Sequence, residues 1–142
     1  MLISTKGRYA LRVMLSLAEK EEGKLVPLQT VAREQEISEK YLESIIVILA
    51  RAGLVYSLRG KKGGYCLSRK PEEYSVGEIL KLTEGSLAPV ACLDSTPNTC
   101  SKASECKTLP MWENLNTIIN NYLYSVTLKD LLNPETSADY QI

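Results

Sequence analysis

The sequence of 142 residues contains no histidine, and this absence excludes several kinds of active site. Without an imidazole there is no Ser-His or Cys-His pair, no HExxH zinc motif and no histidine general base. The sequence also lacks a Walker A motif and a GxGxxG motif, so neither of these nucleotide-binding loops is present. Catalysis by paired carboxylates needs no histidine, but the spacing of the acidic residues marks out no pair. We therefore expect a binding protein rather than an enzyme.

Long apolar runs are also missing. No run reaches the roughly 18–20 residues that cross a membrane. The N-terminal residues resemble a signal peptide over a short stretch, but Arg12 interrupts its apolar part and no cleavage site follows. The length suits one compact domain, or one small domain with an appended element. We expect a cytoplasmic protein.

The sequence has no net charge, because 17 Lys and Arg residues balance 17 Asp and Glu residues. The balance hides an asymmetry, since residues 1–70 carry a net charge of +6 and residues 71–142 a net charge of −6. Such an asymmetry indicates that the first half meets a polyanion, with chance segregation on a solvated surface as the alternative. The charge pattern therefore favours a nucleic-acid partner for the first half.

The first half of the sequence predicts three helices. Apolar residues recur with helical spacing at 4–20, in a shorter stretch after Pro27, and again at 38–52. Ser38 lies at the start of the last stretch, where its hydroxyl can cap the first turn of a helix. The apolar side of this third helix is predicted to face the core, and it consists of Leu42, Ile45, Ile46 and Leu49.

The spacing of the apolar residues changes after Gly53. Residues 54–58 and 65–68 are rich in strand-favouring residues and flank a basic, glycine-rich stretch, which predicts a hairpin. Ser75 and Glu78 have the spacing of a capping box that opens a further helix. Three helices followed by a hairpin is the order of a winged helix-turn-helix. We therefore predict a mainly α fold with a small β wing: a winged helix-turn-helix plus a long C-terminal dimerisation helix.

The expected organisation of the chain has four parts. Residues 1–84 form a winged helix-turn-helix DNA-binding domain, and residues 85–110 form a cysteine-containing loop. Residues 111–133 form the dimerisation helix and a short C-terminal helix, and residues 134–142 form a tail. A loop as long as 85–110 inside a small protein is usually functional or disordered.

The helix at 38–52 is polar at its N-terminal end on the side away from the core. Hydroxyl and charged side chains there can reach base edges in the major groove, and the helix N-terminus favours phosphate. At the hairpin tip, cations can reach the DNA backbone or the minor groove, and glycine permits a close approach. Each feature alone is also typical of an ordinary solvated surface, and it is their order along the chain that favours DNA binding. The candidates are Ser38, Glu39, Lys40, Glu43 and Ser44 in the helix and Arg59, Lys61, Lys62 and Gly64 at the tip.

Three of the four cysteines lie in the 85–110 loop. Cys92, Cys100 and Cys106 are spaced C-x7-C-x5-C, and no export signal favours a disulfide framework. Three thiolates on a flexible loop suit a soft metal or an iron–sulfur cluster. Redox-active thiols, or cysteines without a function, are the alternatives. Cys66 lies in the hairpin, and we interpret it as a small packing residue.

An apolar seam with heptad spacing follows Pro110. We expect this helix to form an antiparallel or crossed pair with its copy in a second subunit, because a two-fold protein reads a palindrome with two recognition helices. Packing of the helix onto its own domain is the alternative. Thr127 can then cap a short helix that ends near Asn133. The seam consists of Trp112, Leu115, Ile119, Tyr122 and Val126.

Several motifs occur together in an order typical of one family. They are residues 3–10 (ISTKGRYA), Ile37-Ser38, Tyr41-Leu42-Glu43, Ala52-Gly53-Leu54-Val55, Arg59-Gly60, Gly63-Gly64-Tyr65 and residues 76–79 (VGEI). The chain closely resembles the Rrf-type winged-helix transcriptional regulators, which include IscR, NsrR and CymR, from residue 1 to about residue 132. The resemblance implies a homodimer on a palindromic operator, with the helix at 38–52 in the major groove and the hairpin tip in the minor groove. It places the family's DNA contacts at Ser38, Lys40, Tyr41, Ser44 and Arg59, and a position linked to operator choice at Glu43.

The resemblance also bears on the cysteine loop. Cluster-binding members carry three cysteines there, and Cys92, Cys100 and Cys106 fall on them. The chain thus resembles the branch that binds a 2Fe–2S or 4Fe–4S cluster, and we expect a repressor that senses cluster, iron, redox or nitric oxide status. Leu109 stands where one group of members has a histidine ligand, and Arg8 stands where another has an acidic ligand. The fourth ligand therefore stays open.

Candidates for the fourth ligand are Asp94, Glu105, Thr108 and an external molecule. Two other functions also stay open. One is a cluster-free regulator of the same fold in cysteine or sulfur metabolism, controlled by a protein partner, thiol oxidation or zinc. The other is an enzyme that uses the cysteine loop as a thiol redox centre.

Two positions depart from the family pattern. Glu36 occupies the turn before the recognition helix, where the family often has glycine or asparagine. If the backbone there is left-handed, glutamate costs about 1 kcal/mol. Ser44 is shorter than the glutamine that is frequent at its position. The resemblance therefore leaves the operator sequence open.

Overall fold

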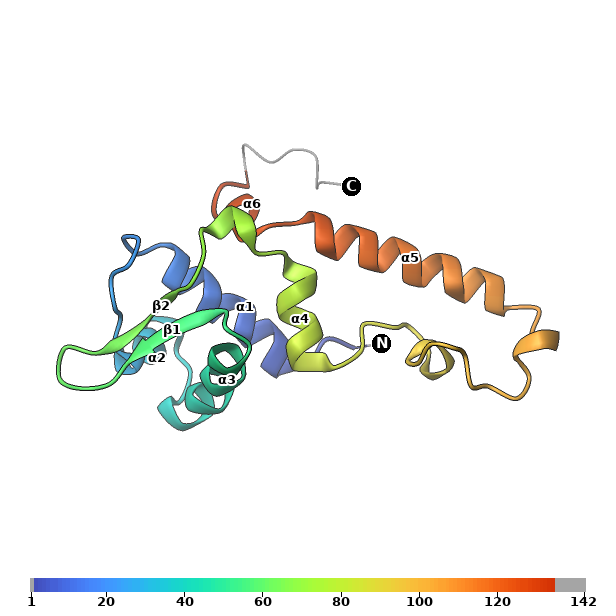
Figure 1. Cartoon of the computed structure of the whole chain (residues 1–142), viewed down its shortest axis with the longest axis horizontal. Coiled ribbons are helices and arrows are strands. Elements are labelled where there is room, and N and C mark those ends of the chain that lie inside the picture. The colour runs from blue at the N-terminus through green and yellow to red at the C-terminus, as the bar shows by residue number, and fades with distance from the viewer. Residues whose placement is uncertain (1, 135–142) are drawn as a thin grey trace.

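The computed structural model of the chain describes residues 2–134. The predicted tail lies outside this range except for Pro134. The order of elements confirms a mainly helical fold with a small β wing (Figure 1). The described elements are α1 (Thr5–Ala18), α2 (Leu28–Gln35), α3 (Glu39–Arg51), β1 (Val55–Leu58), β2 (Gly64–Leu67), α4 (Val76–Glu84), α5 (Leu109–Ser125) and α6 (Leu128–Leu132), with short 3-10 turns at Pro71–Glu73, Ala91–Leu93 and Ala103–Glu105. Within residues 2–134, no helix is both long and apolar enough to span a membrane.

Figure 1 shows two regions that differ in shape. Helices α1 to α4 and the wing form a compact group, from which α5 projects at the end opposite the wing. The cysteine loop connects α4 to α5, and it occupies the projecting end of the molecule. The tip of the wing and the cysteine loop therefore lie at opposite ends of the molecule, with α3 between the wing and α4.

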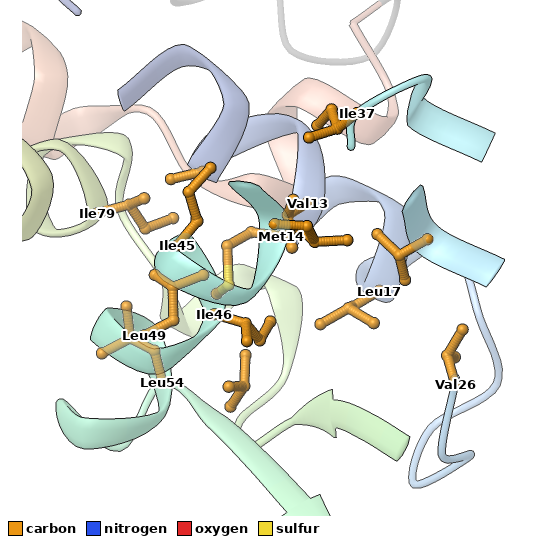
Figure 2. Packing of buried hydrophobic residues seen from close by; sticks show 14 of the residues in the cluster. Val13, Met14, Leu17, Val26, Ile37, Ile45, Ile46, Leu49, Leu54 and Ile79 are labelled. Carbon is orange, nitrogen blue, oxygen red and sulfur yellow. The ribbon is translucent and has the colours of Figure 1, made fainter. Parts of the chain in front are cut away.

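The core forms where the apolar sides of α1 and α3 meet (Figure 2). All four apolar positions predicted in the helix at 38–52 are buried, which confirms the orientation of α3. Full burial of each such side chain contributes roughly 1.5–3 kcal/mol, so a slip in the rotation of α3 would be costly. The side chains that meet are Ala10, Val13, Met14 and Leu17 from α1, Leu42, Ile45, Ile46 and Leu49 from α3, and Leu54, Ile79 and Leu128 from later elements.

Helix ends follow the predicted caps, with two differences. The Ser38 hydroxyl accepts a hydrogen bond from the Tyr41 amide at 3.2 Å, which confirms the predicted start of α3. Helix α1 ends at Ala18, so the prediction of a helix to residue 20 was too long. The predicted capping box of α4 is only half formed, because Ser75 Oγ accepts from the Glu78 amide while the Glu78 carboxylate instead binds Arg69 at 2.9 Å.

The wing is an antiparallel pair in which Val55 is opposite Leu67 and Leu58 is opposite Gly64. An isolated bridge between Val26 and Tyr65 extends the pairing to the chain that precedes α2. The wing is therefore attached on one side to the helix-turn-helix, and β1 forms its free edge.

Tyr74 joins the base of the wing to the body of the protein. Its side chain is fully buried, and its hydroxyl donates to the Leu54 carbonyl at 2.6 Å. The same oxygen accepts from the amides of Ser68 and Arg69, each at 3.0 Å. One phenol group thus satisfies backbone groups on both sides of the hairpin.

The segment around Tyr74 also holds the C-terminal elements. The Leu128 amide donates to the Tyr74 carbonyl at 3.2 Å, and the Val76 amide donates to the Val126 carbonyl at 2.8 Å. An isolated bridge pairs Ser75 with Thr127. The wing, α4 and the start of α6 therefore meet at one junction.

A second junction connects α1 to the end of α4. The Glu84 carboxylate accepts from the Ser4 amide at 2.6 Å and from the Ser4 hydroxyl at 2.8 Å. A side chain at Gly7 would overlap this carboxylate, so glycine allows the two helices to pack closely. The cysteine loop begins directly after Glu84.

The predicted seam on α5 needs a correction. Val126 is the residue after the helix and is only 3% exposed, because it packs with Val76, Leu80 and Leu87 of its own subunit. Tyr122 packs against the same cluster, so neither residue lies in a free seam. The heptad pattern did not show that α5 ends at Ser125, after which Val126 packs against α4 and its carbonyl accepts from the Val76 amide.

The exposed apolar stripe of α5 is instead formed by Met111, Leu115 and Ile118. These side chains are 53%, 37% and 64% exposed, and their spacing of four and three places them on one helix face. Trp112 and Ile119 of the predicted seam are half-buried beside this stripe. The exposed face thus differs from the predicted one, and the two share Leu115.

Substitution of Tyr74 by phenylalanine tests the wing junction. We expect Tyr74→Phe to lower the free energy of unfolding by about 1–3 kcal/mol, because a buried carbonyl and two amides lose their partner. Urea denaturation followed by circular dichroism measures the change. Tyr56→Phe is the matched control, since Tyr56 is 54% exposed. Equal stabilities of the two variants would contradict the assigned function of the Tyr74 hydroxyl.

Candidate functional site

The N-terminal end of α3 presents polar side chains to solvent. Ser38, Lys40, Glu43 and Ser44 are exposed, and Tyr41 is half-buried. Burial of the opposite face of α3 leaves these residues as the part of the helix that can approach another molecule. The structure thus brings together the helix residues that the sequence predicts for DNA contact.

The two serine hydroxyls differ in the hydrogen bond that each can still make. Ser38 Oγ already accepts from the Tyr41 amide, so its own proton is available to donate. Ser44 Oγ donates to the Tyr41 carbonyl at 2.6 Å, so its lone pairs remain available to accept. In the major groove the first can address an acceptor such as guanine O6 and the second a donor such as cytosine N4.

The wing tip presents exposed cations. Arg59, Lys61 and Lys62 are all exposed, and no ion pair engages them within the described part of the chain. A hydrogen bond of 3.0 Å from the Gly63 amide to the Gly60 carbonyl closes the turn. The tip therefore carries cations that are free to meet phosphate or a minor groove.

A close contact with the backbone requires glycine at position 64, and the sequence did not show this contact. A Cβ atom at this position would lie 2.5 Å from the carbonyl carbon of Val26. Glycine is therefore required where β2 lies against Val26, independently of what the wing binds. The close approach that we predicted for Gly64 is made to the protein's own backbone.

A groove separates α3 from the wing and has both on its walls. Its volume is about 540 Å³, and its lining includes Glu43 and Val47 from α3 and Leu58, Arg59 and Gly64 from the wing. Candidate residues from both predicted DNA-reading elements therefore border one concave surface.

Two residues of α1, Tyr9 and Arg12, belong to this region but were not among the predicted site residues. The Tyr9 and Tyr41 rings form an edge-to-face pair with centroids 5.9 Å apart, and the Arg12 guanidinium lies 5.0 Å from the Tyr9 ring. In the sequence, Arg12 stands out only as a break in an apolar run. Its spacing of three from Tyr9 on a helix was the available signal that the two side chains meet.

The cysteine loop carries three free thiols between α4 and α5. Cys100 is exposed, and Cys92 and Cys106 are half-buried. Within residues 2–134, no three Cys, His, Asp or Glu side chains are close enough together to hold a metal ion. The structure therefore places the predicted ligands on one loop but does not gather them into one site.

Two of the cysteines nevertheless make local hydrogen bonds. Thr108 Oγ1 lies 3.4 Å from Cys106 Sγ, and hydrogen bonding from Thr108 lowers the pKa of the Cys106 thiol. A lower pKa favours the thiolate, which is the form that binds metals. Asn98 Oδ1 accepts from the Cys100 amide at 2.8 Å, while Asn98 Nδ2 is buried without a hydrogen-bond partner. An unused N–H donor beside a cysteine suits a sulfur-ligated group.

The candidates for a fourth ligand are less well prepared. Leu109 and Arg8, which stand at the ligand positions of family members, are not candidates: Leu109 begins α5 and has no side-chain ligand atom, and Arg8 binds Thr5 on its own helix. Asp94 accepts from the Ser86 hydroxyl at 2.6 Å, and Thr108 is engaged with Cys106. The donor set of three soft thiols fits an iron or zinc group, but the described residues do not single out a fourth protein ligand.

Cys66 differs from the loop cysteines. It lies on β2 opposite Tyr56, and burial raises the pKa of its thiol. A raised pKa keeps the thiol protonated and unreactive. This agrees with the interpretation of Cys66 as a packing residue.

Comparison with known proteins gives a consistent result. The family described as Rrf2, iron-dependent transcriptional regulator, matches residues 3–134. The chain is 38% identical over 139 residues to a putative HTH-type transcriptional regulator of Neisseria meningitidis serogroup A, covering 98% of this chain and 93% of that protein. It is 37% identical over 131 residues to the regulator CymR of Bacillus subtilis, covering 92% and 89%.

Solved structures are similar to this chain in fold. The structure of CymR (YrzC), the global cysteine regulator of B. subtilis, has a TM-score of 0.75 at 34% identity and covers 100% of this chain and 99% of its own. The structure of T. potens IscR has a TM-score of 0.74 at 35% identity and covers 100% and 92%. The matching family and the curated relatives are named as transcriptional regulators, which excludes the thiol-enzyme alternative. The chain therefore belongs to the Rrf2 family of winged-helix transcriptional regulators, which bind DNA.

Proposed function

We propose that the chain acts as a homodimer that reads a palindromic operator, with α3 in the major groove and the wing tip in the minor groove. The observation that carries the proposal is the shared groove, which has the exposed side chain of Glu43 on its α3 wall and the exposed cation Arg59 on its wing wall. Two such surfaces related by two-fold symmetry match the symmetry of a palindrome.

The side chains divide into two functions on DNA. Ser38, Tyr41, Glu43 and Ser44 lie on α3, where they can read base edges, and a carboxylate such as Glu43 accepts from cytosine N4. The cations contribute affinity without direct sequence reading in the major groove. Lys40, Lys61 and Lys62 neutralise phosphates, and Arg59 suits a narrow minor groove because its negative potential attracts arginine.

Substitutions in the wing test this division. We expect Arg59→Ala to weaken binding to the operator more than binding to random DNA, because it removes a groove contact. Lys61→Ala is expected to weaken both similarly and to reduce the salt slope by about 1, because it removes one phosphate contact. Fluorescence anisotropy over a range of salt concentrations measures both.

The control for these variants is Lys102→Ala, since Lys102 is an exposed lysine of the cysteine loop. Its affinity and salt slope should equal those of the unaltered protein. A salt-independent affinity of the unaltered protein would contradict the proposal that cations of the wing meet phosphate.

A second copy of the chain is the proposed cover of the exposed α5 stripe. Met111, Leu115 and Ile118 form an apolar row on a helix that projects from the compact domain (Figure 1). Such a row is typical of a helix that pairs with a partner helix. We therefore place the dimer contact on this stripe, with Trp112 and Ile119 at its side.

Introduction of a charge into the stripe tests the dimer. We expect Ile118→Asp to shift the protein to monomers and to lower operator affinity at least tenfold, because one half-site then binds without its partner. Thr117→Asp adds the same charge to the neighbouring exposed position and should leave the dimer intact. Sedimentation velocity distinguishes the two states. A dimeric Ile118→Asp variant would exclude this stripe as the contact.

For the cysteine loop we propose an iron–sulfur cluster of the 2Fe–2S or 4Fe–4S type, held by Cys92, Cys100 and Cys106. Support comes from three soft thiols on one loop, the lowered pKa of Cys106 and the unused N–H donor of Asn98. When bound, a cluster supplies redox-sensitive iron whose state can regulate the protein. The regulated function would then be repression in response to cluster, iron, redox or nitric oxide status.

A second candidate is the same regulator without a cluster, in cysteine or sulfur metabolism. The observation that favours it is geometric, since residues 2–134 do not bring three metal-binding side chains together. Its similarity to CymR, a global cysteine regulator, points in the same direction. Control would then come from a protein partner, thiol oxidation or zinc.

Anaerobic purification separates the two candidates. With a cluster, we expect iron and sulfide in the protein and absorption between about 320 and 420 nm from thiolate-to-iron charge transfer. Alanine substitution of Cys92, Cys100 or Cys106 should remove the absorption, whereas Cys66→Ala should retain it. Colourless protein with stoichiometric zinc, or with no metal, would contradict the cluster and favour the second candidate.

A further inference from the structure

We infer that Arg12 is a positioning residue for the recognition helix: it holds the α2–α3 turn in a strained conformation that sets the direction of α3. The inference rests on the proposed function in one respect, namely that α3 reads DNA. Arg12 lies on α1 and is exposed, and neither its charge nor its place in the sequence assigns it this function.

Arg12 makes two hydrogen bonds to one residue of the turn. Its Nε donates to Gln35 Oε1 at 3.1 Å, and its Nη2 donates to the Gln35 backbone carbonyl. Gln35 is the last residue of α2, and its carbonyl belongs to the peptide group that leads into Glu36. The planar guanidinium therefore fixes the peptide that enters the turn, and the side chain that precedes it, in one geometry.

The residue that follows this peptide is strained. Glu36 has φ 55° and ψ 43°, in the left-handed region, and among the described residues it is the only non-glycine with a positive φ. This confirms the conformation that would make glutamate unfavourable at this position. A turn with this strain relaxes unless neighbouring contacts hold it, and the hydrogen bonds from Arg12 act on the adjacent peptide.

Arg12 is also connected to α3 indirectly, through the ring of Tyr9. Its guanidinium lies 5.0 Å from the centre of the Tyr9 ring, and Tyr9 packs edge-to-face on Tyr41 at an interplanar angle of 82°. Tyr41 is in the first turn of α3, among the residues proposed to meet the operator. A single side chain thus contacts the turn before α3 and, through Tyr9, the end of α3 that faces DNA.

An exposed arginine near DNA has a competing function, which is direct contact with a phosphate. The two functions differ in their salt dependence. Loss of a phosphate contact reduces the slope of log affinity against log salt by about 1, whereas loss of a positioning contact leaves the slope unchanged. They also differ in the free protein, where only positioning affects the turn.

The first measurement uses full-length protein and operator DNA. We expect Arg12→Ala to reduce operator affinity about tenfold with the salt slope and the affinity for random DNA unchanged. Arg12→Lys should not rescue, because an ammonium cannot reproduce the two directed hydrogen bonds. Arg8→Ala, one turn earlier on the same helix, is the matched control and should bind normally. A reduced slope together with weaker binding to random DNA would overturn the inference in favour of a phosphate contact.

The second measurement tests the link to the strained turn. Glu36→Gly removes the strain, so Arg12→Ala should cost much less affinity in the Glu36→Gly background, about threefold or less. An equal loss in both backgrounds would show that Arg12 does not act through the turn, and would overturn the inference.

The third measurement needs no DNA, so it remains informative if the proposed operator function fails. Hydrogen exchange of the Glu36 and Ile37 amides, which bond to the carbonyls of Arg33 and Ala32, reports opening of the turn. We expect exchange about tenfold faster in Arg12→Ala and restored towards the normal rate in the double variant with Glu36→Gly. If Arg12→Ala fails to fold, Arg12→Lys, which keeps the side-chain stem, is measured instead. Unchanged exchange in the variant would overturn the inference.

Discussion

Burial of the apolar face of α3 is the constraint on which the rest of the structure depends. Because Leu42, Ile45 and Leu49 must pack against α1, the rotation of α3 about its axis is fixed. That rotation alone decides that Ser38 and Ser44 face solvent at the end of the helix. The wing then attaches through the bridge between Val26 and Tyr65, and its Arg59 lines the groove between α3 and the wing. The proposed DNA-reading surface thus follows from a packing requirement of the core.

Contacts also extend from the core to the cysteine loop. The bridge between Ser75 and Thr127 joins the wing base to the C-terminal segments, and the Glu84 carboxylate binds Ser4 where the loop begins. Both ends of the unit formed by the loop and α5 are therefore attached to elements that pack on α1 or on the wing. These contacts attach the projecting region to the DNA-binding domain at both of its ends. The attachment does not need regular structure in the loop, which contains only two short 3-10 turns.

Much of this could be predicted from the sequence, since helical spacing and caps are local properties. The four buried positions of α3, the hairpin and the start of α3 at Ser38 were predicted correctly. The sequence patterns gave wrong predictions where contacts with distant segments determine which side chains are buried or paired. Heptad spacing identified the apolar residues of α5 but did not show that Val126 is buried against its own subunit. The Glu78 carboxylate pairs with Arg69 and therefore does not complete the predicted capping box. The candidate site was predictable as a set of exposed residues on two elements. The contacts of Arg12 and the separation of the loop cysteines depend on tertiary packing, which no single-sequence pattern contains.

In the proposed complex, two copies of one surface read DNA together, each with a helix in the major groove and a wing in the minor groove. Chemical footprinting of an operator selected from random sequences tests this arrangement, with one reagent for each groove. We expect two equivalent major-groove protections whose centres are separated by a multiple of about 10–10.5 base pairs, each with minor-groove protection beside it. A single protected segment, or protection of the backbone without either groove, would contradict it.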